Sequence, residues 1–179
     1  MRWEALFADL EAQLDAAAAA DLAADVADLT RAERATVALP DRLRAARGAD
    51  VVILVAGGET VAGELLEVAA QWALVGEGTR RALVPLWAVV AVRGHALRSA
   101  PAPGEVVRRL GLGSALRALA RDRASVHLTT DGAELVGRIE RVGADHLDLA
   151  ADVGGIRDVG FPGLVWSVPF AALRVVRSD

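Results

Sequence analysis

The pattern of apolar and polar positions divides the chain into a helical N-terminal part and a β-rich remainder. From residue 51 onward, apolar residues alternate over short runs that end in Gly, Asp or Pro. Such runs are typical of short strands joined by tight turns. Val52–Leu54 predicts a first strand, the next passes through Gly63, and another covers Trp72–Val75. Pro85 cannot donate to a ladder, so we expect a tight turn there before a last strand, the fifth of the module.

The β-rich part contains an internal repeat. The segment from Val51 resembles the segment from Ser125 at a shift of 74 residues, and a later segment matches at a shift of 84 residues. The Gly-rich stretch 151–164 accounts for the difference and predicts a longer loop. The matched pairs are Val52 and Val126, Leu54 and Leu128, Gly58 and Gly132, Gly63 and Gly137, Leu65 and Ile139, Val68 and Val142, Val84 and Val168, Pro85 and Pro169, Leu86 and Phe170, and Arg93 and Arg177. We therefore expect two similar modules, with Val52, Leu54, Leu65 and Val68 and their counterparts buried.

Each module combines a short helix with bent strands. Gly63 and Gly137 lie inside predicted strands, where glycine marks a bend or a close approach of two backbones. A short sheet must bend in this way to close into a small barrel. A helix over 41–47, after Pro40, precedes the first module, and a helix capped by Ser114 precedes the second.

This order of elements resembles the Sm/LSm superfamily and the related SH3-like small barrels. The resemblance covers residues 41–94 and 114–178, and it implies a tandem repeat of two five-stranded barrels. The whole chain is also similar to uncharacterised proteins of high-GC bacteria. Sm proteins typically bind RNA through polar or aromatic loop residues together with Lys or Arg. The sequence contains no Asn and no Tyr, and Val92–His95 falls after the predicted last strand, so no RNA-binding residue is carried over from the family.

The N-terminal part predicts a helix with an apolar stripe. Residues 1–39 contain neither Gly nor Pro, and Thr30 followed by Glu33 resembles a capping box that would begin a second helix. The stripe begins with Trp3, Leu6, Phe7, Leu10 and Leu14, which fall at helical spacing, and it continues through Ala18, Leu22, Val26 and Leu29. The first five are our candidate residues for binding a protein partner or a second copy of the chain. The alternative is that the stripe packs on the chain's own barrels.

These observations predict an α+β fold, in which an N-terminal helical arm is followed by two Sm-like or SH3-like small β-barrels, each preceded by a short helix. We expect the arm at 1–39, the first barrel at 40–97, a linker at 98–113 and the second barrel at 114–179.

The residue types argue against catalysis and against a cofactor. The sequence has no Cys, which excludes disulfides, thiol chemistry and Cys-ligated metals. No two of His95, His127 and His146 have metal-ligand spacing, and no Ser lies in a nucleophile motif. We therefore expect no enzyme, cofactor, metal site or small-molecule substrate. Neither a secretory signal nor a stretch long enough to span a bilayer is visible, so we expect a cytoplasmic protein without a membrane partner.

The charge is acidic overall, with one basic segment. The net charge is −4, and all 20 basic residues are Arg. Residues 98–125 hold six Arg against two acids, and our candidates for anion or RNA contact there are Arg108, Arg109, Arg117, Arg121 and Arg123. Alternatively, these arginines face acids of the N-terminal arm. We expect a non-catalytic interaction or scaffold protein, and the alternative is an RNA-binding or ribosome-associated regulatory protein that uses this Arg-rich segment.

Overall fold

The computed structural model describes residues 2–95, 99–100, 111–151 and 165–178. The chain divides into two compact units, Met1–Ala38 and Leu39–Asp179. The helices are α1 (Arg2–Thr36), α2 (Leu39–Arg44) and α4 (Leu112–Asp122), and the 3-10 turns are η1 (Leu86–Ala88) and η2 (Phe170–Ala172). The strands are β1 (Asp50–Val55), β2 (Thr60–Val68), β3 (Trp72–Glu77), β4 (Arg80–Pro85), β5 (Val89–Arg93), β6 (Ser125–Thr130), β7 (Glu134–Val142), β8 (His146–Ala151), β9 (Val165–Pro169) and β10 (Leu173–Ser178).

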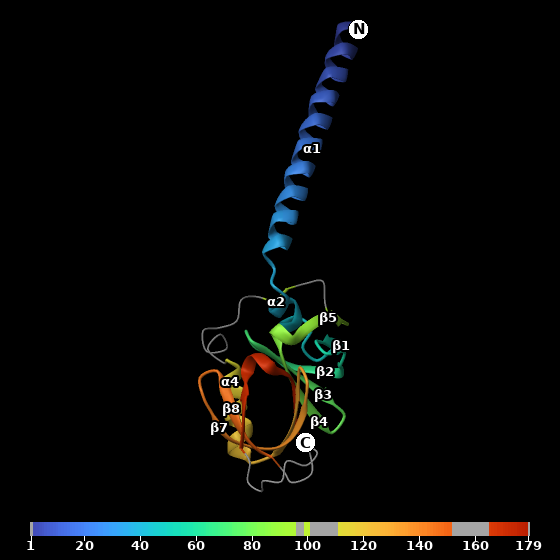
Figure 1. Cartoon of the computed structure of the whole chain (residues 1–179). Helices are drawn as coiled ribbons and strands as arrows, with labels where there is room; N and C mark the ends of the chain where they lie inside the picture. The colour runs from blue at the N-terminus through green and yellow to red at the C-terminus, as the bar shows by residue number, and fades with distance from the viewer. Residues whose placement is uncertain (1, 96–98, 101–110, 152–164, 179) are drawn as a thin grey trace. The chain divides into compact units, whose positions relative to one another are not determined.

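The first unit consists of α1, which Figure 1 shows as one uninterrupted helix. The prediction that a second helix begins at Thr30 is wrong. The Thr30 hydroxyl donates a hydrogen bond to the carbonyl oxygen of Val26 at 2.7 Å, one turn back along the same helix. The side chain is therefore engaged within the helix, and the helix continues past it to Thr36.

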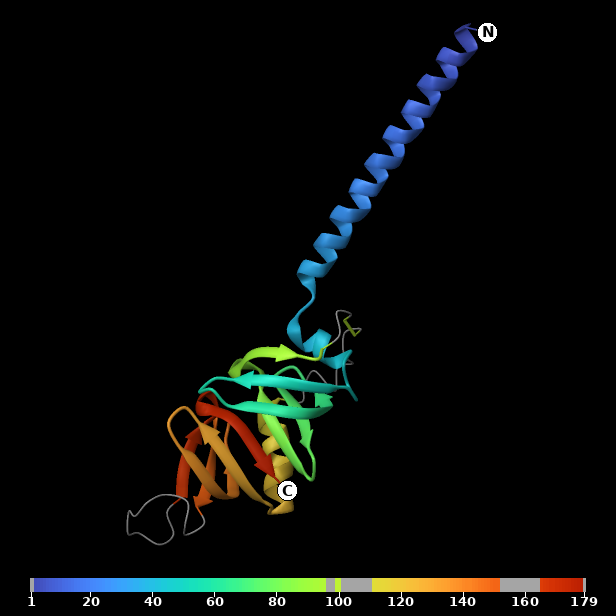
Figure 2. The same ribbon diagram turned by 90° about the vertical axis from the view of Figure 1, so that its right-hand side faces the viewer.

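The second unit is built on one ten-stranded antiparallel sheet with the order β5-β1-β2-β3-β4-β10-β6-β7-β8-β9. The expected fold class, two small closed barrels behind a helical arm, is wrong. β10 pairs with β6 on one side and with β4 on the other, so the last strand of the chain joins both halves into a single sheet. In Figure 2, the cyan and green strands of the first half meet the orange and red strands of the second half along β10. The sheet is open, because β5 and β9 form its two ends.

The two halves of the sheet have the same strand order and the same irregularities. β5-β1-β2-β3-β4 in the first half corresponds to β10-β6-β7-β8-β9 in the second. In both halves the register shifts where the first strand pairs with the last, in β1 with β5 and in β6 with β10. A second shift occurs where the second strand pairs with the third, at Leu65/Glu67 of β2 and at Ile139/Arg141 of β7. Each half also ends its fourth strand at a proline, Pro85 or Pro169, which a 3-10 turn follows, as the sequence predicted.

Gly63 and Gly137 mark close approaches between backbones, as predicted. A Cβ atom on Gly63 would collide with the carbonyl oxygen of Gly76 on β3, and a Cβ atom on Gly137 would collide with the carbonyl oxygen of Ala150 on β8. Each glycine lies in the long second strand of its half, which must bend to pair with both neighbours.

The face of β1 that meets the core differs from the prediction. Val51, Ile53 and Val55 are buried, whereas Leu54 is 45% exposed and Val52 is only partly buried. The turn between β1 and β2 is one residue longer than the turn between β6 and β7, so Val51, and not Val52, corresponds to Val126. A shift of one residue exchanges the two faces of a strand. The other predicted core residues, Leu65, Val68, Val126, Leu128 and Ile139, are buried, and Val142 packs partly buried against them.

The hydrophobic residues form two clusters that interlock across the sheet. Val175 of β10 belongs to the cluster of the first half, and the next residue, Val176, belongs to the cluster of the second half. Conversely, Ala69, Trp72 and Leu83 of the first half are buried in the second cluster, which α4 covers with Leu112 and Leu116. The second half therefore completes its core with residues of the first half.

Candidate interaction surfaces

The joint between the halves is a short antiparallel pairing of β4 with β10. Its Cα partners are Leu83 with Val176, Ala82 with Arg177, and Arg81 with Ser178. Ala82, Leu83 and Val176 are almost fully buried there. The joint thus consists of three residue pairs and the apolar contacts on both sides of them. It holds together β4 and β10, which are far apart in sequence.

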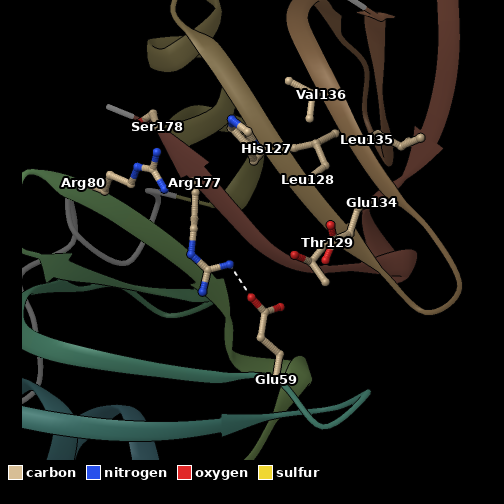
Figure 3. A pocket seen from close by; sticks show the side chains of 10 residues that line it. All are labelled: Glu59, Arg80, His127, Leu128, Thr129, Glu134, Leu135, Val136, Arg177 and Ser178. Atoms are coloured by element: carbon tan, nitrogen blue, oxygen red, sulfur yellow. Dashed lines mark hydrogen bonds and ion pairs between the residues drawn. The ribbon is translucent and has the colours of Figure 1, made fainter. Parts of the chain in front are cut away.

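An ion-pair cluster lies beside this joint. The Nε of Arg177 donates a hydrogen bond to Oε2 of Glu77 at 2.8 Å, and its Nη1 bonds to Oε1 of Glu59. Figure 3 shows the Arg177 side chain extending from β10 toward Glu59 in a small cavity of about 110 Å³ that His127, Thr129 and others line. Desolvation by burial lowers the pKa of Arg177, but the hydrogen bonds to Glu77 and Glu59 outweigh it and the net pKa is raised. The guanidinium group therefore stays charged in place.

Each end of the sheet exposes a strand whose counterpart is covered. In the described part of the chain, β5 pairs only with β1, and β9 pairs only with β8. β5 holds the place of β10 in its half, and β9 holds the place of β4. β10 and β4 pair with each other, so β5 and β9, the two end strands, each correspond to a strand that binds another strand within this protein.

Apolar side chains are exposed at both ends of the sheet. Val90 of β5 is 68% exposed, and Trp87 in the preceding turn is 45% exposed. At the other end, Val165 and Trp166 of β9 are exposed as well. Exposed apolar side chains next to unpaired backbone groups are typical of a surface that binds another chain.

The predicted basic surface is partly assembled by α4. Arg117 and Arg121 lie one turn apart on this helix and line one shallow depression together with Arg141 and Glu140 of β7. Arg123 is exposed at the end of α4, where its φ is 52°. Within the described residues, Arg117, Arg121, Arg123 and Arg141 form no ion pair. Arg108 and Arg109 lie outside the described residues.

Sequence reasoning missed two neighbours of this surface. Arg141 comes from the repeat of the β-rich part and lies outside the Arg-rich segment, so only the packing of α4 on β7 brings it to Arg117 and Arg121. Arg117 also lines a second depression, with Trp87, Gln71 and Phe170. Trp87 precedes β5 in the first half, and nothing in the local sequence relates it to α4.

The N-terminal candidate residues all lie on α1. Phe7 and Leu14 have side chains that are 60% and 70% exposed, and Leu22, Val26 and Leu29 farther along the stripe are exposed too. The side chains of Trp3, Leu6 and Leu10 lie outside the described part of the structure. No other described element belongs to the unit of residues 1–38, so the stripe has no partner within that unit.

The described residues hold no group of three or more His, Asp or Glu side chains that could bind a metal ion. Among the same residues, no helix has the length and apolar character needed to cross a membrane.

Comparison with the models of known protein families and with curated proteins finds no match for this chain. The resemblance to Sm-like proteins therefore remains a prediction.

Proposed function

We propose that this protein is a non-catalytic interaction protein that binds other polypeptide chains by strand addition at the ends of its sheet. The observation that supports the proposal is the equivalence of β5 with β10. β10 accepts β4 along one side, and β5 presents the corresponding side without a partner among the described residues. Strand addition gains affinity from main-chain hydrogen bonds and specificity from the alternating side chains.

The surroundings of β5 support the same role. Val90 and Trp87 supply exposed apolar surface, and Arg93 supplies a charge at the position that Arg177 occupies in β10. Because Arg177 bonds to carboxylates beside the joint, the counterpart Arg93 favours a partner strand with an acidic or aromatic neighbour.

A peptide that copies β4 tests the proposal. We expect the peptide Thr79–Leu86 to bind the full-length protein at millimolar concentrations and to shift the backbone amide NMR signals of Val92, Arg93 and Gly94. The same peptide with proline in place of Leu83 is the control, because the backbone N–H of Leu83 faces the β10 side of β4 and proline removes that donor from the ladder. Equal shifts with both peptides, or shifts that avoid β5, would contradict the proposal.

A second candidate function is the binding of single-stranded RNA on the α4 surface. The observation that favours it is the convergence of Arg117, Arg121 and Arg141, which are exposed and lack ion pairs in the described residues. Trp87 lines a second depression together with Arg117. Single-stranded nucleic acids bind where cationic grooves adjoin aromatic stacking surfaces. Glu140 in the same depression and the net charge of −4 oppose this role.

A titration of labelled single-stranded RNA at two salt concentrations tests this second candidate. Three phosphate contacts predict a log–log slope of about −2, from about −0.7 per contact. We expect Arg117→Glu with Arg121→Glu to abolish binding. Arg31→Glu is the matched control, because it changes the charge equally but lies on α1, where Arg31 pairs with Asp28. Binding that survives the double change, or that is independent of salt, would exclude the arginine surface.

A further inference from the structure

We propose that β9 of one copy of the chain pairs with β5 of a second copy, in the register that β4 and β10 use within one chain. The inference rests on the proposed function, and it names the partner of the sheet ends. Its basis is that the one joint between the halves is formed by two strands whose counterparts are both unpaired in the described chain.

The correspondence of the strands is defined residue by residue. Val92 lies opposite Ile53 as Val176 lies opposite Leu128, and Arg93 lies opposite Val52 as Arg177 lies opposite His127. On the other strand, Ala82 lies opposite Val75 and Trp166 lies opposite Leu149. Ala82 and Trp166 are therefore counterparts, and so are the residues that follow them, Leu83 and Ser167.

The internal joint therefore predicts the register between two copies. Leu83 with Val176 becomes Ser167 with Val92, and Ala82 with Arg177 becomes Trp166 with Arg93. The third pair, Arg81 with Ser178, becomes Val165 with Gly94. Both strands run antiparallel, as β4 and β10 do.

Residues of β9 and β5 are more exposed than their counterparts in the joint. Ala82 is fully buried in the joint, whereas its counterpart Trp166 is 37% exposed. Val176 is buried, whereas its counterpart Val92 is only partly buried. In the proposed pair, β5 of one copy would cover Trp166 of the other, and β9 would cover Val92. The burial of this apolar surface favours association.

The arginine of the joint would have a different partner between two copies than within one chain. Arg177 bonds to Glu59 and Glu77, but the residues that correspond to these acids in the second half are Ala133 and Ala151. Directly opposite Arg93 of the second copy, the first copy offers the indole of Trp166. An arginine beside a tryptophan face is a favourable cation–π pair, so the indole replaces the missing carboxylates.

The outer face of this joint makes the association weaker than the internal one. Trp72, Leu74 and Leu83 of the first half pack into the second cluster, whereas their counterparts are His146, Asp148 and Ser167. The Ser167 hydroxyl bonds to Asp148 at 2.7 Å, so this face is polar and adds little apolar burial. We therefore expect a reversible, concentration-dependent association that runs head to tail, from β9 of one copy to β5 of the next.

Cross-linking between single-cysteine variants tests the register, and the absence of native Cys makes the result unambiguous. Full-length Val92→Cys and Ser167→Cys proteins, one of them carrying a mass tag, are mixed in equal amounts and oxidised. We expect a disulfide between position 92 of one chain and position 167 of the other, because paired cross-strand positions lie close enough for the bond. The two like-with-like cross-links should be minor.

A more exposed cysteine out of register is the control. Val90→Cys mixed with Ser167→Cys should form at least fivefold less mixed disulfide, although position 90 is the more accessible one. Equal yields at positions 90 and 92, predominance of like-with-like products, or no mixed product would overturn the proposal.

Sedimentation of the uncross-linked proteins gives an independent readout. We expect Trp166→Lys to lower the average mass at high concentration, since it places a cation opposite Arg93, and the added change Arg93→Glu to restore it. Failure of the restoration would overturn the pairing. The peptide titration separates the two proposals. If the protein binds the β4 peptide but neither cross-links nor associates, strand addition stands as the proposed function and the second copy is excluded as the partner.

Discussion

Arg177, two residues from the C-terminus, donates a hydrogen bond from Nε to Glu77 at 2.8 Å, across the joint between the two halves of the sheet. The same guanidinium group also bonds to Glu59, so one side chain of the last strand holds two acids of the first half. All three side chains are partly buried.

Replacing Arg177 tests how far this contact stabilises the joint. Arg177→Met removes the charged hydrogen bonds to Glu59 and Glu77, and we expect the free energy of unfolding to fall by about 1–3 kcal/mol. Urea denaturation measures the change. Arg47→Met is the control: Arg47 pairs with Glu67, and both side chains are about half exposed, so a loss below about 1 kcal/mol is expected. Equal losses in the two variants would show that the joint does not depend on Arg177.

Gly137 should not tolerate a side chain. In Gly137→Ala, the Cβ atom meets the carbonyl oxygen of Ala150, and β7 and β8 must move apart. We expect a loss of about 1–3 kcal/mol in thermal or denaturant unfolding, as for other overpacked sites. Gly132→Ala is the control, because no atom lies within 4 Å of a Cβ placed there, and its effect should stay within about 0.5 kcal/mol. A stable Gly137→Ala protein would contradict the close approach.

Gln71 should act as a cap for α4. Its Oε1 accepts a hydrogen bond from the backbone N–H of Leu112 at 2.9 Å, at the beginning of the helix. We expect Gln71→Ala to lower the free energy of unfolding by about 0.5–2 kcal/mol, the range for a lost N-terminal cap. Gln71→Glu keeps an acceptor and adds a favourable charge at the helix N-terminus, so it should retain most of the stability. Identical losses in both variants would exclude the capping role.

Ile53 and Leu54 provide a direct test of which face of β1 meets the core. Ile53 is fully buried and Leu54 is 45% exposed. We expect Ile53→Ala to cost about 2–5 kcal/mol and Leu54→Ala less than about 1 kcal/mol. Denaturant unfolding of the two variants decides between this register and the one that the sequence repeat suggested, for which the larger loss would fall on Leu54.

The apolar stripe of α1 remains a predicted partner-binding surface. Leu14→Glu with Leu22→Glu should lower the average mass measured by sedimentation if α1 associates with another helix, because both side chains are exposed and a charge there opposes burial. Ala16→Glu with Ala23→Glu adds the same charge on the opposite face of the helix and should change nothing. A fall in the melting temperature in the first variant alone, without a change in mass, would favour packing within the chain.

The basic surface was only half predictable. Arg117 and Arg121 follow from helical spacing in the sequence, but Arg141 and Trp87 reach them through the tertiary structure. The cap of α4 is a similar case: the sequence suggested Ser114, whereas the helix begins earlier at Leu112 because Gln71, from the turn before β3, bonds to it.

By itself, the sequence determined the local features of this protein. Alternating apolar residues, the glycines at 63 and 137 and the prolines at 85 and 169 constrain the backbone within a few residues, so strands, bends and the turn after each fourth strand could be predicted. Only the tertiary structure decided that the two halves form one sheet. The pairing of Leu83 with Val176 joins residues remote in sequence, and it depends on the shape and burial of both strands together. A single residue in the turn after β1 likewise reversed the face that enters the core, because side chains alternate along a strand and no local pattern records the length of the turn that closes it.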